Sequence, residues 1–314
     1  MELLLMITGF CLAAYSVVGN DVIQTLGTFL SSNEKKKWYV LWGYTATIMA
    51  AVLLFGWFNM GDVSYGRLSK VPVPDIFHWY YILPPLILLV ITRLGVPVST
   101  TFLILSVFSE QLIGSMIEKS VWGYVVAFGT AAAIYAVISR LLEKHFIHTE
   151  ITEREEKIWS ALQWCSTGFL WSQWLIQDLA NIYVYLPRKM SDLSFLLSVA
   201  LLLGLLAYIF YRRGGAVQKI VTSKTNTTDV RSATLIDFLY GIILLVFTTW
   251  SKIPMSTTWV FVGLLAGREY MISFMLKDPS LRKVTQVISL DLFKVFSGLI
   301  VSLALSYLLT YLAA

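Results

Sequence analysis

The sequence predicts an all-α polytopic membrane protein, built from two inverted-topology repeats with interrupted helices and re-entrant-type hairpins. Three observations predict this class: a composition suited to a lipid bilayer, about ten hydrophobic segments, and two polar motifs that each occur twice at one interval. Of the 314 residues, 57% are hydrophobic and only 14% are charged. Soluble domains average about 25% charged residues, so we expect a bilayer to surround this chain.

The aromatic and charged residues fit the same environment. Eleven tryptophans and sixteen tyrosines are typical of side chains that anchor helices at membrane interfaces. The net charge of +5 resides in short loops between apolar segments, which indicates membrane orientation rather than nucleic-acid binding. Cys11 and Cys165 both lie in apolar runs, so neither a disulfide framework nor a metal site is predicted.

The apolar segments are the predicted membrane helices. They fall at roughly 3–32, 38–58, 78–92, 102–117 and 121–142, then at 158–186, 193–211, 233–249, 259–276 and 285–313. A spanning helix needs about 20 residues. The third and fourth segments are shorter, so they form either two crossings or one re-entrant hairpin. Both versions contribute an even number of crossings, so the choice does not change whether each half crosses the membrane an odd or an even number of times.

Lysine and arginine predict the orientation. If the N-terminus is outside, sixteen basic residues face the cytoplasm, and six face the other side: Arg67, Lys70, Lys119, Arg188, Lys189 and Lys252. We therefore predict that both termini are extracellular and that the protein lies in the plasma (inner) membrane. The sequon Asn226-Thr227-Thr228 would then be cytoplasmic, and we interpret it as a chance match.

Between the two halves lies the most charged stretch of the chain. It separates a first inverted repeat, residues 1–142, from a second, residues 158–314, with a charged cytoplasmic linker at 143–157. His145 and His148 stand three positions apart in it. We interpret them as part of a solvated linker face rather than as a metal-binding pair.

Each half carries one aspartate in apolar surroundings. The motif residues are Asn20, Asp21 and Gln24 in the first segment, and Gln177, Asp178 and Asn181 in the sixth. An aspartate at bilayer depth costs roughly 2.5–3.5 kcal/mol on insertion scales and is a functional candidate by default. We expect the first segment to be an interrupted helix, with free main-chain carbonyls beside Asp21.

A second motif pair reads PVSTTF (97–102) and PMSTTW (254–259). Asp21 and Asp178 are 157 residues apart, as are Ser99 and Ser256, and the chain is twice that length. One interval shared by two unrelated motif pairs predicts an internal duplication. Because each half has an odd number of crossings, the second must be inverted. Secondary transporters have this architecture and bind their substrate near the midplane.

Each Ser-Thr-Thr segment is predicted to begin a helix, because proline suits a first turn and serine is a natural N-cap. The free N–H groups and hydroxyls of such a terminus bind anions without a full positive charge. A single segment more often bonds back to its own helix, but the repetition favours binding. The predicted anion ligands are Ser99, Thr100 and Thr101, facing Ser256, Thr257 and Thr258 around one tetrahedral oxyanion.

The aspartate motifs predict a cation site. Their hard oxygen acceptors suit Na⁺ or a proton rather than a soft metal. The expected Na⁺ ligands are Asp21, Gln24, Asp178 and Asn181. A cation and an anion bound together neutralise one another, which is the physical basis of symport. The structural alternative is an aspartate that caps a kinked helix, and Asp237 at the start of the eighth segment is compatible with such a cap.

The four motifs resemble those of the inorganic phosphate transporter (PiT) family, whose halves each carry a GANDVANA-like and a PVSTTH-like motif. The counterparts here are VGNDVIQT (18–25), IQDLANIY (176–183), PVSTTF and PMSTTW, and their order and spacing cover most of the chain. The resemblance implies secondary active uptake of phosphate with Na⁺ or H⁺. It also implies that the four motifs line one shared site and that both termini are extracellular.

The motifs also depart from the family pattern. Phe102 and Trp259 stand where the family keeps histidine, and Gln24 replaces an asparagine. In the second half Ile176-Gln177 replaces a glycine and an asparagine, and Val184 and Tyr185 replace small residues. The bulkier residues indicate a smaller or differently coordinated anion, so sulfate and bicarbonate stay open beside phosphate.

The predicted function is a symporter of an inorganic oxyanion, phosphate first, driven by Na⁺ or H⁺. It is not an enzyme and needs no organic cofactor; its predicted partners are the anion and the lipid bilayer, not nucleic acid, and a homodimer is compatible. A channel built on the same repeats stays open. An intramembrane aspartyl protease needs two aspartates that share a proton and a GxGD motif, but Asp178 follows Ile176-Gln177.

Overall fold

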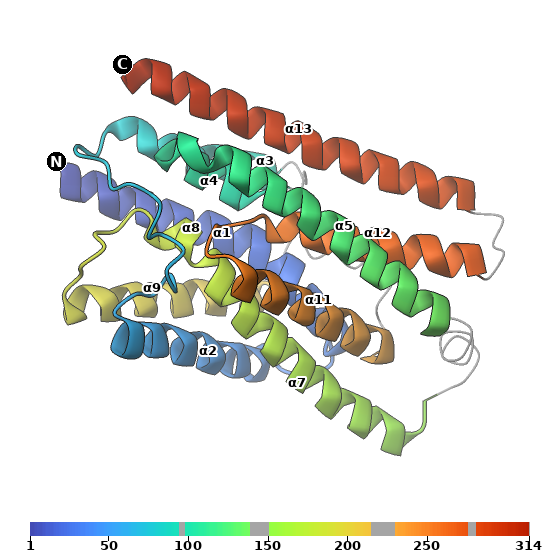
Figure 1. Ribbon diagram of the computed structural model, residues 1–314. Helices are drawn as coiled ribbons and strands as arrows, with labels where there is room; N and C mark the ends of the chain where they lie inside the picture. The colour runs from blue at the N-terminus through green and yellow to red at the C-terminus, as the bar shows by residue number, and fades with distance from the viewer. Residues whose placement is uncertain (94–97, 139–150, 215–229, 276–280, 314) are drawn as a thin grey trace.

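The computed structural model describes residues 1–93, 98–138, 151–214, 230–275 and 281–313, and these contain helices and loops without strands (Figure 1). The helices are α1 (Glu2–Ser32), α2 (Trp38–Phe55), α3 (Leu83–Arg93), α4 (Thr100–Phe108), α5 (Ile113–Ile138), α7 (Glu153–Asp178), α8 (Ala180–Tyr183), α9 (Asp192–Tyr211), α11 (Val230–Trp250), α12 (Thr257–Met275) and α13 (Leu281–Ala313). Short turns, Gly56–Met60, Trp79–Ile82 and Glu110–Leu112, extend α2 and precede α3 and α5. Every predicted apolar segment overlaps one of these helices.

The outer surface is apolar, as a bilayer requires. Within the described residues, six helices are long and apolar enough to cross a membrane. On α9, Leu193, Leu196 and Leu197 are all exposed, and their spacing places them on one face of the helix. Large exposed apolar surfaces mark contact with lipid or a partner, so the chain is an integral membrane protein.

One predicted boundary is wrong. The fourth and fifth segments were expected to meet near residues 118–120, but α4 ends at Phe108 and α5 runs through Lys119. The Lys119 Nζ atom donates hydrogen bonds to the carbonyl oxygens of Ser251 (2.9 Å) and Ile253 (2.6 Å). Because the protein itself solvates this charge, a lysine can lie inside an otherwise apolar helix.

The short helices α3 and α4 favour the re-entrant version of the first hairpin. They have 11 and 9 residues, fewer than the about 20 that a spanning helix needs, even when the turn Trp79–Ile82 is added. Pro97, which lies between them in the sequence, is outside the described residues.

The expected interruption of the first helix is wrong, and the structure instead has a break at the aspartate of the second half. Helix α1 continues unbroken through Asp21, and α7 ends at Asp178, with a turn at Leu179 before α8. In α1 the Asn20 amide donates to the Val98 carbonyl (3.2 Å), and Thr100 donates to Asp21 (2.5 Å). The first hairpin therefore satisfies these side chains, and no free carbonyls of α1 are needed.

Corresponding helices of the two halves are separated by the predicted interval of 157 residues. Helices α3 and α11 end 157 residues apart, and α4 and α12 begin 157 residues apart. Helix α12 packs along α5 while α4 packs against α13, and α1 packs on α3 while α7 packs on α11. Exchanging the halves turns each contact into its partner contact, as two related halves would require. The inverted repeat itself stays our proposal.

Helix α12 approaches α5 through two glycines. A Cβ atom on Gly263 would lie 2.6 Å from the Tyr124 carbonyl oxygen, and one on Gly267 would lie 2.3 Å from the Phe128 carbonyl oxygen. The spacing is the small-xxx-small pattern that lets membrane helices pack closely. This contact fixes α12, whose first turn carries the second Ser-Thr-Thr segment.

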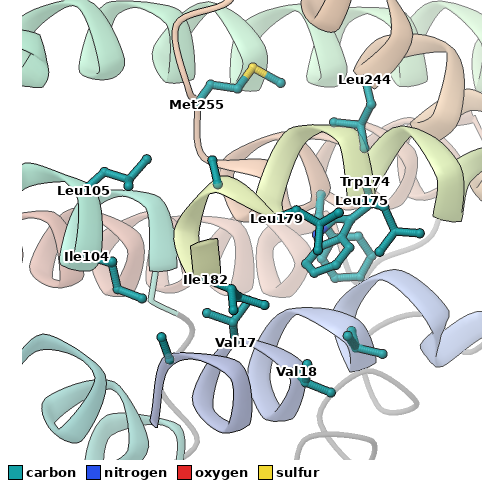
Figure 2. Close-up of a cluster of buried hydrophobic side chains, with 14 of the residues drawn as sticks. Val17, Val18, Ile104, Leu105, Trp174, Leu175, Leu179, Ile182, Leu244 and Met255 are labelled. Atoms are coloured by element: carbon teal, nitrogen blue, oxygen red, sulfur yellow. The ribbon is translucent and has the colours of Figure 1, made fainter. Parts of the chain in front are cut away.

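Apolar side chains pack around the crossing of α1 with α7 and α8 (Figure 2). Val17 of α1 lies beside Ile182 of α8, and Leu179 lies near Trp174. All four side chains are buried. This packing surrounds the polar residues of the aspartate motifs, which lie on the same helices.

Candidate functional site

The structure brings the two aspartates to the first turn of α4. Thr100 Oγ1 donates to Asp21 Oδ2 (2.5 Å), and Thr101 Oγ1 lies 3.4 Å from Asp178 Oδ1. Helix α1 supplies Asp21, and the C-terminal end of α7 supplies Asp178. All four side chains are at most 2% exposed, so this is a closed polar site within apolar packing.

Asn181 connects the two sides of the site. Its Nδ2 atom lies 3.1 Å from Thr100 Oγ1, 3.2 Å from Thr101 Oγ1 and 2.9 Å from Asp178 Oδ1. An amide nitrogen carries only two protons, so three acceptors within reach mark the centre of the network. Hydrogen bonds therefore run without a gap from Asp21 through Thr100, Asn181 and Thr101 to Asp178.

The two Ser-Thr-Thr segments begin helices that meet. Ser99 caps α4 by accepting from the Phe102 N–H (3.2 Å), which confirms the predicted N-cap, and Ser256 accepts from the Trp259 N–H in the same way (3.3 Å). Thr101 Oγ1 also donates to the Met255 carbonyl (3.1 Å), just before the second segment. The two helix N-termini therefore lie next to each other, and their positive dipole ends add at one place.

The two aromatic residues behind these segments contact each other. The ring centroids of Phe102 and Trp259 are 6.0 Å apart, in an edge-on arrangement of 68°. Their side chains are 0% and 2% exposed. These are the positions at which the resembled family keeps histidine, so an apolar pair stands here in place of two imidazoles.

Several polar atoms of the site are buried without a partner. Across the described part of the chain, Asp178 Oδ2, Asn181 Oδ1 and Gln177 Nε2 have no hydrogen-bond partner. Buried polar atoms are nearly always paired, and each exception calls for an explanation such as an ion. The two unpaired oxygens, one from the Asp178 carboxylate and one from the Asn181 amide, are hard ligands that fit a small hard cation such as Na⁺.

The remaining predicted residues lie nearby but make different contacts. Gln24 lies one turn from Asp21, and its amide reaches Asn20 Oδ1 at 3.4 Å. Gln177 Oε1 accepts from Thr248 of α11 (3.4 Å) rather than joining Asn181. Thr257 and Thr258 are both buried, at 3% exposure. The structure thus groups Asp21, Asp178 and Asn181, and places Gln24 and Gln177 at the margin.

Sequence reasoning missed Arg67. It lies in the loop after α2, is 1% exposed, and donates to the carbonyls of Ile176 (3.3 Å), Thr248 (3.3 Å) and Ser251 (2.8 Å). Burial lowers the pKa of Arg67 to about 10, and the negative charge of Asp178 opposes this shift, so the guanidinium is charged at neutral pH. With Lys119 it holds the segment that precedes the second Ser-Thr-Thr motif.

Two further residues were missed or misread. The Tyr240 hydroxyl of α11 donates to the Thr257 carbonyl (3.0 Å) and interacts with Thr25. Asp237 was interpreted as a helix cap, which is wrong, because α11 begins at Val230 and Asp237 lies inside it. Tyr240 and Asp237 both lie in α11, whose sequence is typical of an ordinary apolar helix. Only the presence of an acidic residue in such a segment could have pointed to Asp237.

Comparison with known proteins adds a statement about fold. No protein-family model and no curated protein matches the sequence. A solved structure described as "The sodium-dependent phosphate transporter" matches with a TM-score of 0.62 and 16% identity, over 99% of each chain. The whole chain therefore has the fold of that transporter, and the fold implied by the four motifs is confirmed.

Proposed function

We propose that this protein is a secondary active transporter that carries an inorganic oxyanion, phosphate first, together with Na⁺ or H⁺. One observation carries the proposal: a single buried network joins both aspartates to the adjacent N-termini of α4 and α12. The similar structure is a sodium-dependent phosphate transporter by its description, which supports the substrate and the coupling ion. The fold is thus that of a transporter and not that of an enzyme.

The hydroxyl groups explain how the anion and the cation are coupled. Each threonine hydroxyl has one proton to donate. Thr100 donates its proton to Asp21, and Thr101 donates to the Met255 carbonyl, with Asp178 Oδ1 at 3.4 Å as its alternative acceptor. A phosphate that accepts these protons withdraws the Thr100 proton from Asp21 and keeps the Thr101 proton from Asp178. The carboxylates then bind a cation more tightly, and by linkage the cation raises the affinity for phosphate equally.

The electrostatics point the same way. A buried carboxylate is costly unless it is paired or protonated, and the described contacts of Asp21 and Asp178 are hydroxyls and amides. Two helix N-termini supply only partial positive charges. Arg67 adds one full positive charge near Asp178, but a bound phosphate brings further negative charge, so each cation that binds with it offsets part of a net negative charge.

Sulfate is the second candidate. The apolar Phe102–Trp259 pair offers no imidazole to a protonated phosphate, which favours an anion without a proton. The unpaired Asp178 Oδ2 can nevertheless accept a phosphate hydroxyl, a function that sulfate does not need. Phosphate is therefore proposed first.

The test uses Asp21→Asn and Asp178→Asn in proteoliposomes with radiolabelled phosphate. Asparagine keeps the size of each side chain and removes its charge, so we expect ion-driven uptake to fall to background while the protein stays folded and inserted. Thr47→Val serves as a control, because Thr47 is a hydroxyl on α2 that bonds its own helix (2.7 Å). Wild-type uptake in both aspartate variants would remove the coupling role.

A further inference from the structure

Two buried cations lie together at the connection between α11 and α12. Arg67 Nη1 and Lys119 Nζ donate to the same oxygen, the Ser251 carbonyl, at 2.8 and 2.9 Å. The two nitrogens are therefore at most the sum of these distances, 5.7 Å, apart. Arg67 is 1% and Lys119 is 6% exposed. Within the described residues, no carboxylate forms a salt bridge with either cation. Like charges this close repel each other, so an anion would stabilise the pair.

Both cations keep hydrogen-bond donors to spare. A guanidinium has five N–H groups and an ammonium has three. Arg67 uses three of them on main-chain carbonyls, and Lys119 uses two, which leaves two donors on Arg67 and one on Lys119. Neutral amides can also donate to carbonyls, so holding the connection does not by itself require two full charges.

Lys252 adds a third positive charge to the pair. A Cβ atom on Gly66, the neighbour of Arg67, would lie 3.8 Å from Lys252 Cδ, so the lysine side chain extends along the loop that carries Arg67. Arg67 and Lys252 both act electrostatically on Lys119. Three basic side chains from three separate segments therefore gather at one place.

This cluster lies at the start of a short path to the second Ser-Thr-Thr segment. Lys252 is exposed, and the chain is buried from Pro254 onward. Ser120, which follows Lys119 on α5, accepts from the Ser256 N–H (2.9 Å). Lys252 and Ser256 are four residues apart, which is at most about 14 Å in an extended chain. The connection therefore leads from the surface to the predicted anion ligands.

The cluster lies on the predicted extracellular side, where α2 and α11 both end. In Figure 1 the loop after α2 runs past the α11–α12 connection on its way to α3. At the interval of 157 residues, Lys119 and Lys252 correspond to Leu276 and Gly95, and only Arg67 corresponds to another basic residue. The internal repeat therefore does not account for the two lysines, whereas the capture of an incoming anion does.

We propose that Arg67, Lys119 and Lys252 form an outer entry site that binds the oxyanion before it reaches the Ser-Thr-Thr segments. This inference rests on the proposed function. The exposed Lys252 meets the arriving anion first, and the buried pair behind it raises the local concentration of anions. Hydrogen bonds between a cation and an oxyanion are stronger than those to a neutral carbonyl. A bound anion thus competes with the carbonyls of the connection and loosens the segment that carries Ser256.

The first experiment measures the uptake of radiolabelled phosphate in phosphatidylcholine proteoliposomes. Because Lys252 is exposed, Lys252→Gln removes its charge with little effect on packing. We expect kcat/KM to fall about threefold in Lys252→Gln and about tenfold in Lys252→Glu, with kcat near the wild-type value. The dependence of kcat/KM on ionic strength should also weaken. Lys189→Gln, an exposed lysine on the same predicted side, should behave as wild type.

A lipid headgroup offers the same phosphate chemistry as the free anion, so a second set of vesicles separates the two sources. The uptake measurement is repeated in phosphatidylcholine that contains phosphatidylglycerol. An equal effect of Lys252→Gln in both kinds of vesicle supports an entry site for the free oxyanion. An effect that occurs only with phosphatidylglycerol would show that the lysine binds lipid and would overturn the entry site.

The second experiment needs no transport. In a variant without native cysteines, Lys252→Cys is labelled with an anionic sulfonatoethyl and a cationic trimethylammonium methanethiosulfonate reagent. Because Arg67 and Lys119 remain beside it, the ratio of anionic to cationic reaction rates should be about tenfold higher than at Lys189→Cys. Phosphate added without Na⁺ should slow the anionic reagent. Lys119→Gln can still donate to the carbonyls but lacks the charge, and it should lower the ratio.

Unchanged kcat/KM and salt dependence in Lys252→Gln, or equal reagent ratios at the two cysteines, would overturn the entry site, and phosphate uptake by the wild-type protein would leave the proposed function intact. The reverse case is also distinct. If the wild-type protein transports no oxyanion but the anionic reagent still prefers Lys252→Cys and phosphate slows it, the entry site stands and the proposed function fails. If Lys119→Gln does not fold, the reagent ratio at Lys252→Cys decides alone.

Discussion

At the scale of single residues, the chemistry of this site rests on two threonine hydroxyls rather than on the aspartates alone. Thr100 and Thr101 are 2% and 1% exposed and contact Asp21, Asp178, Asn181 and the Met255 carbonyl. A hydroxyl is both donor and acceptor, so it can move between a carboxylate and a bound anion. We therefore assign the coupling of anion and cation to these hydroxyls.

Replacing the hydroxyls tests this assignment. Thr100→Val and Thr101→Val keep the side-chain shape, and each should weaken phosphate binding about tenfold, because a buried donor is lost. They should also weaken the dependence of phosphate affinity on the cation. Thr100→Ser and Thr101→Ser restore a hydroxyl and should recover both properties. Isothermal titration with phosphate at several Na⁺ concentrations measures the effect, and wild-type cation dependence in both valine variants would contradict it.

The sequence singled out the four polar motifs but not how each residue is held. One repeated interval related the two aspartates to each other and the two Ser-Thr-Thr segments to each other, but it did not predict that Thr100 bonds Asp21 or that Thr101 lies near Asp178. The contacts of Arg67 and Lys119 could not be predicted, because both residues donate to main-chain carbonyls of distant segments. Main-chain acceptors leave no mark in a sequence, so such residues look like ordinary loop or interface charges.

At the scale of elements, the hairpins determine where the helix N-termini lie. Helix α4 is short and buried, and α12 is held against α5 by Gly263 and Gly267. The unbroken α1 shows why a local pattern can mislead. A polar run within an apolar segment predicts an interrupted helix, but here the neighbouring hairpin supplies the hydrogen-bond partners of Asn20 and Asp21, so the helix continues. Tertiary contact decided the outcome, and the residues of α1 alone carry no information about it.

The glycine contact gives a prediction for an element. Gly263→Ala places a methyl group 2.6 Å from the Tyr124 carbonyl oxygen, so α12 must shift. We expect a loss of about 1–3 kcal/mol in stability and a weaker anion site, measured by thermal unfolding in detergent and by phosphate binding. Gly204→Ala on α9 is the matched control, because nothing lies within 4 Å of its added Cβ. Equal stability of the two variants would refute the close contact.

At the scale of the whole molecule, the two halves contribute unequally to one site. The first half supplies Asp21 and the short helix α4, and the second supplies Asp178, Asn181 and α12. Rocking of one half against the other would open the shared site to one side at a time, as in transporters with inverted repeats. Which side of the membrane each opening faces follows from the orientation that the basic residues predict.

Orientation is tested by labelling from outside the cell. In a variant without Cys11 and Cys165, Lys189→Cys should react with an impermeant maleimide in intact cells, because it lies on the predicted extracellular side. Lys36→Cys should react only after the membrane is permeabilised. Both residues lie in loops that the structure describes. The opposite pattern of labelling would contradict the predicted orientation.

The most direct test of the central claim is an uptake panel with the purified wild-type protein in proteoliposomes. Radiolabelled phosphate, sulfate and bicarbonate are each offered with a Na⁺ gradient, with a pH gradient, and with neither. The account predicts that phosphate accumulates against its concentration difference only when a cation gradient is present, and that dissipating the gradient releases it. Accumulation of no oxyanion under any gradient, or uptake that merely equilibrates whether or not a gradient is present, would contradict symport.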